Sequence, residues 1–475
     1  MPCIDAFLSR SIIIMSDSLF NNDTIAAIAT PFGMAGIGII RISGPLSLET
    51  AEKLFRSSKN KKIESHRLYH GHFTDASGEI IDEVLLSCMK APYTYTREDI
   101  VEINTHSGPM LLSKILQTVL NQGVRLAKPG EFTFRAFING RIDLLQAEAV
   151  MDLINARSER GIILSNRQMN GGPGEQIKDL RDKVLGLLAM TEVAIDYPEE
   201  NIGTDSIDDA ISELKNEVIK PIEEIVKSHS SRKIWVEGMD TVIVGRVNAG
   251  KSSLLNRLLM EEKAIVSSIP GTTRDLIETT IYIKGIPLKI TDTAGLRDGK
   301  GEIEKIGISL SRKKFKEADI ALIVIDQSRP LNDEDREIIS SMDKANSIVI
   351  LNKNDLISRI DEQEFRKITG DVSAVKISAL TGDGIDALKD KISDKIVSSD
   401  TGIENHLVPN IRQKTALMKA LEHFRDAVSN LKENSPMEII SFDLKNGIEK
   451  LEEITGEGQG NDLYDKIFSQ FCLGK

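Results

Sequence analysis

Cysteine, excess positive charge and long apolar runs are all scarce in this sequence of 475 residues. Its three cysteines, Cys3, Cys88 and Cys472, lie far apart without metal-ligand spacing, which argues against a zinc site or a disulfide framework built on them. No run of about 18 apolar residues occurs, so we expect no membrane span. These absences predict a protein of the reducing cytoplasm.

The charge balance limits the partners that the chain can bind alone. Lysine and arginine number 60 against 72 aspartates and glutamates, for a net charge of -12. Because affinity for phosphate backbones comes mainly from excess cations, we expect poor non-specific binding of nucleic acid, so a nucleic-acid role needs a local basic patch or a basic partner. The composition, 40% hydrophobic and 28% charged, excludes a multi-span membrane protein and a disordered chain.

The hydrophobic pattern changes several times along the chain. Residues 23–140 alternate short apolar runs with glycine and proline, which predicts mixed strands and helices, with helices over 46–56 and 109–121. Apolar residues then recur at helical spacing, give way to short buried-strand runs after residue 240, and return to helical spacing after about 400. One helical domain split by an inserted α/β domain explains this order, and two separate helical domains would give the same pattern.

We therefore expect an N-terminal extension, a mixed α/β domain, a first helical segment, an inserted α/β domain and a second helical segment that ends in FCLGK, over residues 1–22, 23–140, 141–236, 237–398 and 399–475. Pro221 lies inside the first helical segment and is expected to kink or interrupt a helix there.

The strongest local motif is a phosphate-binding loop. Gly245 to Ser252 fits GxxxxGK[ST], and it follows the strand-like TVIV and precedes the helix-like SLLNRLL. The glycines let backbone N–H groups curl around phosphate oxygens, and the helix N-terminus favours an anion. Lys251 is expected to reach the β- and γ-phosphates, and Ser252 to ligate Mg²⁺.

Further motifs in the same order indicate guanine rather than adenine. Asp355 in Asn-Lys-Asn-Asp carries a carboxylate that can accept two N–H bonds from guanine, which adenine does not supply. The preceding Asp292-Thr-Ala-Gly295 and the later Ser378-Ala-Leu add contacts to Mg²⁺, γ-phosphate and the guanine carbonyl, and a switch threonine is expected in Gly271-Thr-Thr. The expected GTP contacts are Asn248, Ala249, Gly250, Lys251, Ser252, Ser253, Ser267, Ser268, Ile269, Pro270, Gly271, Thr272, Thr273, Asp292, Thr293, Ala294, Gly295, Asn352, Lys353, Asn354, Asp355, Ser378, Ala379 and Leu380.

The residue after Asp-Thr-Ala-Gly is Leu296, where many GTPases have a glutamine that orients water. An apolar side chain cannot polarise water, so catalytic help must come from elsewhere. One source is a monovalent cation held by Asn248 and the oxygen-rich loop 267–272, which would stabilise charge between the phosphates as an arginine finger does. A second source is an acid, and Glu302 or Glu304 can order a water.

The chain resembles the MnmE (TrmE) family of tRNA-modification GTPases. The segments that carry the resemblance include PGEFTFRAFINGRIDLLQAEAVMDLI, AIDYPEE, GRVNAGKSSLLN, PGTTRD, DTAGLR and the terminal FCLGK. The resemblance implies an N-terminal α/β domain that dimerises and binds a tetrahydrofolate, and an all-α helical domain interrupted by a Ras-like P-loop GTPase domain. The chain departs from the family pattern at Met34-Ala35, where the family has Arg-Gly.

The resemblance also assigns roles to residues. To Lys251 and Asp292, which the GTPase motifs place in the catalytic set, it adds Glu304, as the acid that organises water, and Cys472. It implies Mg²⁺ ligands at Ser252 and Thr273, and K⁺ ligands at Asn248, Ser267, Ile269 and Thr272. It implies contacts to 5-formyl- or methylene-tetrahydrofolate from Arg41, Glu102, Arg141 and Lys475.

The resemblance implies partners as well: a second copy of the chain, tRNA, and an FAD-dependent protein of the MnmG (GidA) family that carries FAD and NADH, with no membrane involved. Together they would add a carboxymethylaminomethyl or aminomethyl group to the wobble uridine. The alternative is a regulatory GTPase switch in ribosome or tRNA-factor assembly, which has no need of the PGEFT and FCLGK segments. A stand-alone folate enzyme is disfavoured by the GTPase motifs.

Overall fold

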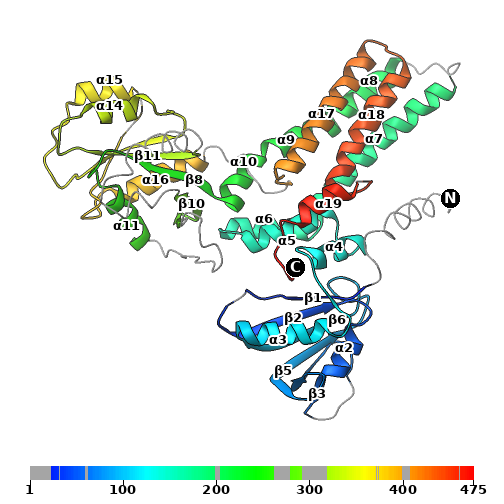
Figure 1. Cartoon of the computed structure of the whole chain (residues 1–475). Helices are drawn as coiled ribbons and strands as arrows, with labels where there is room; N and C mark the ends of the chain where they lie inside the picture. Colours follow the sequence, from blue (N-terminus) through cyan, green and yellow to red (C-terminus); the bar gives the residue numbers. More distant parts are fainter. Residues whose placement is uncertain are drawn as a thin grey trace. The chain divides into compact units, whose positions relative to one another are not determined.

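The structure is a computed structural model, and it describes residues 23–31, 33–58, 63–197, 204–261, 279–290, 318–370, 372, 374–397, 407–458 and 460–475. The chain divides into two compact units, Met1–Glu148 with Gly456–Lys475, and Ala149–Thr455 (Figure 1). The expected extension 1–22 lies outside the described residues. We expected 399–475 as one segment, whereas Gly456–Lys475 belongs with the N-terminal unit.

The first unit is built on a seven-stranded sheet of order β3-β4-β5-β6-β2-β1-β7. All its strand pairs are antiparallel except β1 with β7. The strands are β1 Ile25–Ile28, β2 Ala35–Ser43, β3 Phe55–Ser57, β4 Arg67–Thr74, β5 Ile80–Met89, β6 Ile100–Ser107 and β7 Arg125–Leu126.

Two helices of this unit confirm the sequence prediction. They are α2, Ser47–Leu54, and α3, Pro109–Leu120. Helix α3 begins with Pro109, whose fixed φ suits a first helical turn, and it buries Leu112, Ile115 and Val119 in the core of the sheet. The unit also contains α4, Glu131–Ile138, and α19, Asn461–Phe468, while α5, Leu144–Asn155, leads into the second unit.

The C-terminal segment is held on the first unit by aromatic packing. The ring centroids of Phe134 and Phe468 are 5.1 Å apart, and those of Phe137 and Tyr464 are 5.2 Å apart. Gly130 has a φ of 70°, and a Cβ there would lie 2.5 Å from the carbonyl oxygen of Phe468. Glycine is therefore required where PGEFT meets the tail.

The helical part of the second unit joins segments from before and after the inserted domain. Helix α18 packs against both α7 and α17 (Figure 1). At Gly447 of α18, a Cβ would lie 2.1 Å from the ring of Phe424 on α17, so glycine permits this close approach. The prediction of one split helical domain is confirmed. Its helices are α6 Glu159–Met169, α7 Gly172–Asp196, α8 Thr204–Glu213, α9 Lys220–Lys227, α10 His229–Arg232, α17 Ile411–Lys432 and α18 Met437–Thr455.

The interruption expected near Pro221 is present. The π-helical turn η1, Leu214–Ile219, lies between α8 and α9 and directly precedes Pro221 in the first turn of α9, as expected where a proline removes a backbone donor from a helix. A second π-helical turn, η2, spans Lys233–Glu237 before the inserted domain. None of the helices in the described part of the chain is both long and apolar enough to cross a bilayer.

The inserted domain has a six-stranded sheet of order β13-β12-β11-β8-β10-β9. Strand β11 is buried along its whole length, as expected for a parallel sheet covered on both faces. The predicted strands are confirmed, and the antiparallel edge strand β9 is an addition. The elements are β8 Met239–Val244, α11 Lys251–Glu261, β9 Thr279–Ile283, β10 Ile286–Ile290, β11 Ile320–Asp326, α14 Asp333–Ser340, β12 Ser347–Asn352, α15 Glu362–Thr369, β13 Val375–Lys376 and α16 Ile385–Val397.

Candidate functional site

The phosphate loop joins the carboxyl end of β8 to the start of α11, the edge where open α/β sheets bind ligands. Its curvature depends on residues with positive φ: Gly245 at 152°, Asn248 at 63° and Gly250 at 99°. A Cβ at Gly245 would lie 2.2 Å from the carbonyl oxygen of Val324 on β11, so the loop lies directly on the neighbouring strand.

Lys251 lies across this loop. Its Nζ donates to the carbonyl oxygens of Gly245 at 2.7 Å and Arg246 at 2.9 Å. Burial lowers the pKa of Lys251. The ammonium group is therefore fixed over the loop at the N-terminus of α11, where positive charge and backbone N–H groups converge on an anion site.

Asn352, at the end of β12, connects the phosphate loop to the guanine motifs. Its Nδ2 donates to the carbonyl oxygen of Ala249 at 2.9 Å, and its Oδ1 accepts from the backbone N–H of Ala379 at 3.0 Å. Gly250 makes room for this amide, because a Cβ there would lie 2.1 Å from Nδ2. One buried side chain thus holds three of the predicted GTP-binding segments together.

Asp355, the residue expected to recognise guanine, is oriented by the Ser378-Ala-Leu segment. Its Oδ1 accepts from the hydroxyl of Ser378 at 2.6 Å. The adjacent Asn354 accepts from Nε2 of Gln327 at 3.0 Å and donates through Nδ2 to Asp383 at 3.0 Å. The carboxylate is therefore pre-oriented in a loop fixed from both sides.

Lys353 has a φ of 68°, and its Nζ lies 2.6 Å from Oδ2 of Asp326. Burial alone would raise the pKa of Asp326, but hydrogen bonds from Lys353 and Ser328 hold that pKa below its usual range. Arg257 of α11 donates to the carbonyl oxygens of Ala379, at 3.2 Å, and Leu380. The sequence analysis did not identify Asp326 or Arg257. Asp326 could have been found, because it ends a buried strand next to the strand that leads into NKND.

The structure describes only part of the predicted nucleotide site. It brings together the loop 248–253 and the segments 352–355 and 378–380. The remaining predicted residues lie outside the described residues, and they are Ser267, Ser268, Ile269, Pro270, Gly271, Thr272, Thr273, Asp292, Thr293, Ala294, Gly295, Leu296, Glu302 and Glu304. Of the four expected K⁺ ligands, only Asn248 is among the residues that the structure describes.

The residues expected to contact a folate are brought together in the first unit. Arg41 on β2 and Glu102 on β6 are direct cross-strand neighbours, and Nε of Arg41 lies 2.8 Å from Oε1 of Glu102. Nη1 of Arg41 also donates to the carbonyl oxygen of Gly474 at 3.1 Å. This bond links residues that are 433 positions apart in the sequence.

Tyr95 lies between two of the predicted cations. The guanidinium carbon of Arg141 is 4.7 Å from the centroid of its ring, and that of Arg41 is 5.7 Å from the same ring. Nη1 of Arg141 also donates to the carbonyl oxygen of Tyr95 at 3.2 Å. Tyr95 and Arg141 line a pocket of ≈ 470 Å³, within the range for a small-molecule site. Sequence reasoning missed Tyr95, because nothing local distinguishes it from Tyr93.

The C-terminal tail, residues 471–475, contacts the rest of the first unit through its backbone. The N–H of Gly130 donates to the carbonyl oxygen of Cys472 at 3.3 Å. Gly474 has a φ of 86°, and a Cβ there would lie 2.5 Å from the carbonyl oxygen of Ile28. Burial and the positive charge of Arg41 lower the pKa of Lys475. The predicted ligand Lys475 is therefore held close to Arg41, beside the pair that Arg41 forms with Glu102.

The two described cysteines differ sharply. Cys472 is exposed, whereas Cys88 is buried in the sheet and burial raises the pKa of its thiol to about 12. A thiol that stays protonated and shielded is inert, so of these two cysteines only Cys472 is accessible to a reactant.

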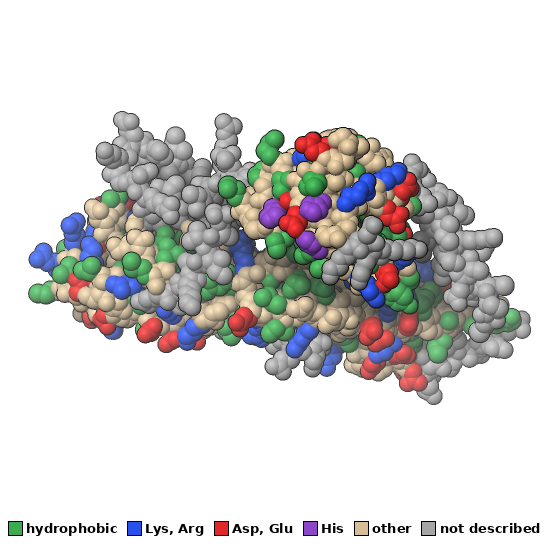
Figure 2. Space-filling model, turned by 90° about the horizontal axis from the view of Figure 1, so that it is seen from below, with side chains coloured by type: hydrophobic (Ala, Val, Ile, Leu, Met, Phe, Trp, Pro, Cys, Tyr) green, Lys and Arg blue, Asp and Glu red, His purple; other side chains and the backbone are tan. Residues whose placement is uncertain are grey.

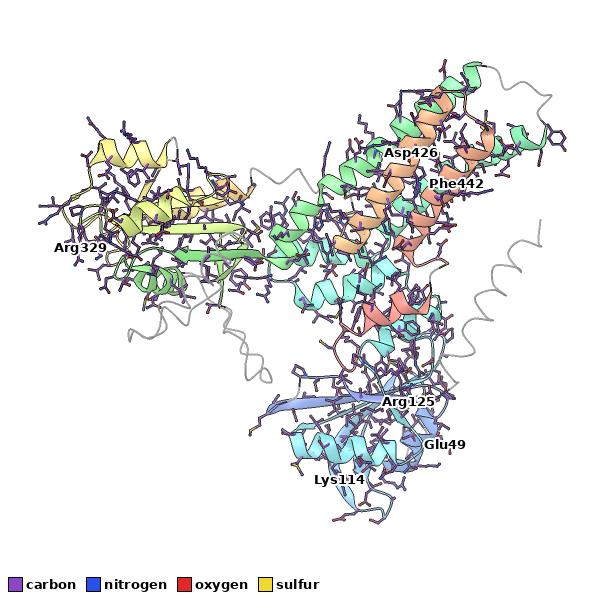
Figure 3. The ribbon with its side chains drawn as sticks, turned by 45° about the horizontal axis from the view of Figure 1, so that its top comes forward. Glu49, Lys114, Arg125, Arg329, Asp426 and Phe442 are labelled. Atoms are coloured by element: carbon purple, nitrogen blue, oxygen red, sulfur yellow. The ribbon has the colours of Figure 1, made fainter. Side chains whose placement is uncertain are left out.

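A buried ion-pair network supports the segment around Glu131. This side chain is 2% exposed, and its Oε1 lies 2.6 Å from Nη2 of Arg125 and 3.0 Å from Nη2 of Arg135. Arg135 also forms ion pairs with Asp23 and Glu98. Arg125 is labelled in Figure 3. Burial alone would raise the pKa of Glu131, but the hydrogen bond from Arg125 and the nearby charges hold that pKa low. The network fixes the PGEFT segment to the edge of the sheet.

Histidine side chains lie close together around an acidic group on the face shown in Figure 2. In the first unit, Nε2 of His70 lies 2.6 Å from Glu83, and Nδ1 of His106 lies 2.8 Å from Asp82. The hydrogen bond that the ring of His106 donates to the carboxylate of Asp82 raises the pKa of this exposed histidine. Because each ring already has a carboxylate partner at the surface, we read these as surface pairs of small energetic effect.

Comparisons with known proteins cover nearly the whole chain. The family described as the MnmE helical domain matches residues 144–472, and the GTP-binding protein TrmE N-terminus matches residues 24–141. The tRNA modification GTPase MnmE of Clostridioides difficile (strain 630) is 47% identical over 461 residues, which are 96% of this chain and 100% of that protein. The protein of the same name from Thermoanaerobacter pseudethanolicus is 45% identical and covers 95% of this chain and 99% of that protein.

Among solved structures, the G domain of the T. maritima FeoB iron transporter is 26% identical and covers 34% of this chain and 98% of that chain, with a TM-score of 0.25.

Proposed function

The chain belongs to the MnmE family of tRNA modification GTPases, so it is a GTP-hydrolysing enzyme of tRNA modification, and we propose that it uses a tetrahydrofolate one-carbon unit at the wobble uridine. The product is a carboxymethylaminomethyl or aminomethyl group on carbon 5. The one observation that supports this best is the hydrogen bond from Arg41 to Gly474, since it joins one predicted folate ligand to the residue that precedes another, Lys475.

The nucleotide half of the proposal follows from the loop geometry. Lys251, held over the phosphate loop, would bind the β- and γ-phosphates, and the carboxylate of Asp355, oriented by Ser378, would accept guanine N–H groups. Ser252 in the first turn of α11, with Thr273, would hold Mg²⁺, because hydroxyl oxygens are the hard donors that this ion prefers. Lys251 would then act on the phosphates, Asp292 would hold the Mg²⁺ shell through a water, and Glu304 would order the attacking water.

Potassium activation is the second element of the proposal. Asn248 has positive φ at the rim of the phosphate loop, and its side-chain oxygen would serve as one ligand of K⁺, with Ser267, Ile269 and Thr272. A bound monovalent cation supplies positive charge between the β- and γ-phosphates. This is needed because Leu296 cannot orient water.

The cations near the tail suit a folate. Arg41, Arg141 and Lys475 present positive charge to the carboxylates of a 5-formyl- or methylene-tetrahydrofolate, and Glu102 can accept N–H groups of the pterin. Of these four residues, Arg141 lines the pocket of ≈ 470 Å³, together with Tyr93 and Tyr95, which offer it an aromatic wall. Cys472 lies in the docked tail and is exposed, which suits a catalytic thiol at this site.

The partners follow from charge and family. A net charge of -12 makes the chain a weak binder of tRNA on its own. An FAD-dependent MnmG (GidA) family protein, with FAD and NADH, would supply the flavin chemistry and most of the tRNA-binding surface. The chain would act in the cytoplasm as a homodimer.

The first experiment is nucleoside analysis of tRNA from cells that lack the gene. The proposal predicts loss of the 5-substituted wobble uridine. If the nucleosides are unchanged while ribosome assembly fails, the alternative of a regulatory GTPase switch replaces it.

A second experiment tests hydrolysis. GTP turnover is expected to be at least about tenfold faster in KCl than in NaCl, because the cation stabilises charge that develops on the phosphates. Glu304→Ala should slow turnover and leave GTP affinity intact. Equal rates in the two salts would refute the cation, and equal rates in the two proteins would refute the acid.

A further inference from the structure

A cluster of possible metal ligands lies between helices α17 and α18, in the part of the second unit that carries no nucleotide motif. His423 and Asp426 are three residues apart on α17, so they share one face of that helix, and Asp443 faces them from α18. One ligand atom from each, an imidazole nitrogen and two carboxylate oxygens, lies within 4.8 Å of the others. Figure 3 labels Asp426 on α17 and Phe442, the neighbour of Asp443, on α18.

The burial of Asp443 sets this cluster apart from a group of surface acids. Asp443 is 8% exposed, whereas Phe442 beside it is 64% exposed, so the carboxylate points into the helix pair and not to solvent. A buried carboxylate is costly without a counter-charge. None of the ion pairs in the described part of the chain includes Asp443 or Asp426.

The nearest cations in sequence are engaged elsewhere. Arg425 lies 2.6 Å from Glu223, and Lys445 lies 2.8 Å from Glu192. No side-chain hydrogen bond within the described residues involves His423 or Asp426. The two carboxylates therefore lack a positive partner other than the imidazole, and a bound cation would supply one.

A second observation points to a ligand. Asn430 of α17 donates through Nδ2 to Oδ2 of Asp443 at 2.8 Å, and its own Oδ1 accepts from the hydroxyl of Ser435 at 3.2 Å. This relay fixes the orientation of the buried carboxylate and leaves its other oxygen without a partner among the described residues. Such outer hydrogen bonds are how proteins orient carboxylates that bind metals.

We propose that His423, Asp426 and Asp443 form a divalent transition-metal site that joins α17 to α18. One imidazole nitrogen with two carboxylate oxygens suits Zn²⁺ or a similar ion, whereas Mg²⁺ and Ca²⁺ prefer oxygen donors alone. Tetrahedral Zn²⁺ places such ligand atoms about 3.4 Å apart, so small side-chain rotations close the cluster around the ion. The site uses no cysteine, and cysteine spacing in the sequence therefore has no bearing on it.

The consequence is a fixed register between the two helices that carry the second half of the split helical domain. The ion bridges α17 and α18 across their interface, and three protein ligands leave a fourth position for water or for a side chain of a partner. Metal binding would therefore stiffen this hairpin independently of GTP.

The test uses the full-length chain after treatment with EDTA, in the presence of GDP and excess Mg²⁺. Titration with ZnSO₄ by calorimetry is expected to show one saturable site per chain. His423→Ala and Asp443→Asn should each weaken it at least about tenfold, and Asn430→Ala should weaken it by a similar factor through the lost orientation. Glu422→Gln, an exposed acid of the same helix, is the matched control and should leave the site unchanged.

Two further readouts keep the result unambiguous. Co²⁺ in place of Zn²⁺ should give visible absorption bands without thiolate charge transfer, and His423→Ala should remove them. Circular dichroism checks that each variant is folded. Because His423 is only partly buried, its truncation tests the site even if Asp443→Asn does not fold. Absence of saturable binding, or the same isotherm in wild type and His423→Ala, would overturn the proposal.

Discussion

The nucleotide site and the tail-bound site of the first unit, which consists of Arg41, Glu102, Arg141 and Lys475, are assembled in opposite ways. The phosphate loop is a continuous segment whose shape is built in by residues of positive φ, and Asn352 joins it to the guanine motifs. The tail-bound site takes Arg41, Glu102, Arg141 and Lys475 from distant segments, and its characteristic bond spans 433 positions. The first is a local motif fixed by tertiary contacts, whereas the second does not exist until the C-terminal tail meets strands β2 and β6.

This difference decides which changes should be most damaging. In the phosphate loop, backbone conformation is the vulnerable feature, since a Cβ at the wrong glycine meets fixed atoms. In the first unit, the vulnerable features are the buried charges and the docked tail. Substitutions at glycines, at buried charges and in the tail separate these two kinds of dependence.

The largest effect is expected at Gly250. Gly250→Val adds a β-branched side chain at a φ of 99°, with its Cβ 2.1 Å from Nδ2 of Asn352. Backbone strain and the loss of the two Asn352 hydrogen bonds together cost about 4 kcal/mol, or about 1000-fold in GTP affinity. Titration with a fluorescent GTP analogue measures this.

Gly186→Ala in α7 is the control, because a Cβ there meets nothing within 4 Å. It should bind nucleotide as wild type does. A Gly250→Val protein that binds GTP normally would show that the loop is not held by Asn352.

The second effect concerns stability. Glu131→Gln leaves Arg125 and the 5%-exposed Arg135 without their shared carboxylate, and it should lower the opening free energy of the first unit by about 3 kcal/mol. Hydrogen exchange of peptides from residues 23–148 reports this quantity. Glu49→Gln, which removes a surface pair with Lys53, should change it by less than about 1 kcal/mol. Figure 3 labels Glu49.

The same carboxylate predicts an acid sensitivity. The pKa of Glu131 lies below its ordinary value of 4.5. The stability that the ionised carboxylate adds to the fold is therefore fully present above that pH, and it is lost as the pH falls through the folded-state pKa. Wild type should lose stability more steeply than Glu131→Gln in this acid range. Parallel stability curves for the two proteins would show that Glu131 is not part of the acid response.

The smallest effect is expected at the tail. Gly474→Ala forces a side chain into a φ of 86°, 2.5 Å from the carbonyl oxygen of Ile28, so the tail should undock. Folate affinity should fall about tenfold, for a strain of about 1–2 kcal/mol. Faster removal of the tail by carboxypeptidase would report undocking directly, and Gly172→Ala, which meets nothing within 4 Å, should behave as wild type.

The fold was predictable where one element carries its own signal. The helices 109–120 and 251–261, the buried strands of the inserted domain and the split helical domain all follow from periodicity and motif order. The edge strand β9 was missed, although Ile281 and Ile283 alternate with polar residues as in an exposed edge.

The site was predictable only in part. Lys251 and Asp355 follow from motifs, and Arg41 and Lys475 follow from family resemblance. Tyr95 and the network around Glu131 were not found, because their roles arise from contacts between residues far apart in sequence. The packing of Phe468 against Phe134 is likewise invisible in either segment alone.

The most direct test of the account is titration of the full-length chain with 5-formyl-tetrahydrofolate by calorimetry. We predict one saturable site per chain, weakened at least about 100-fold by Arg41→Ala, which removes a charge-assisted contact and the bond to Gly474, and unchanged by Arg56→Ala on β3. Absence of binding, or equal affinity in wild type and Arg41→Ala, would contradict the claim that the two chain ends form a one-carbon site.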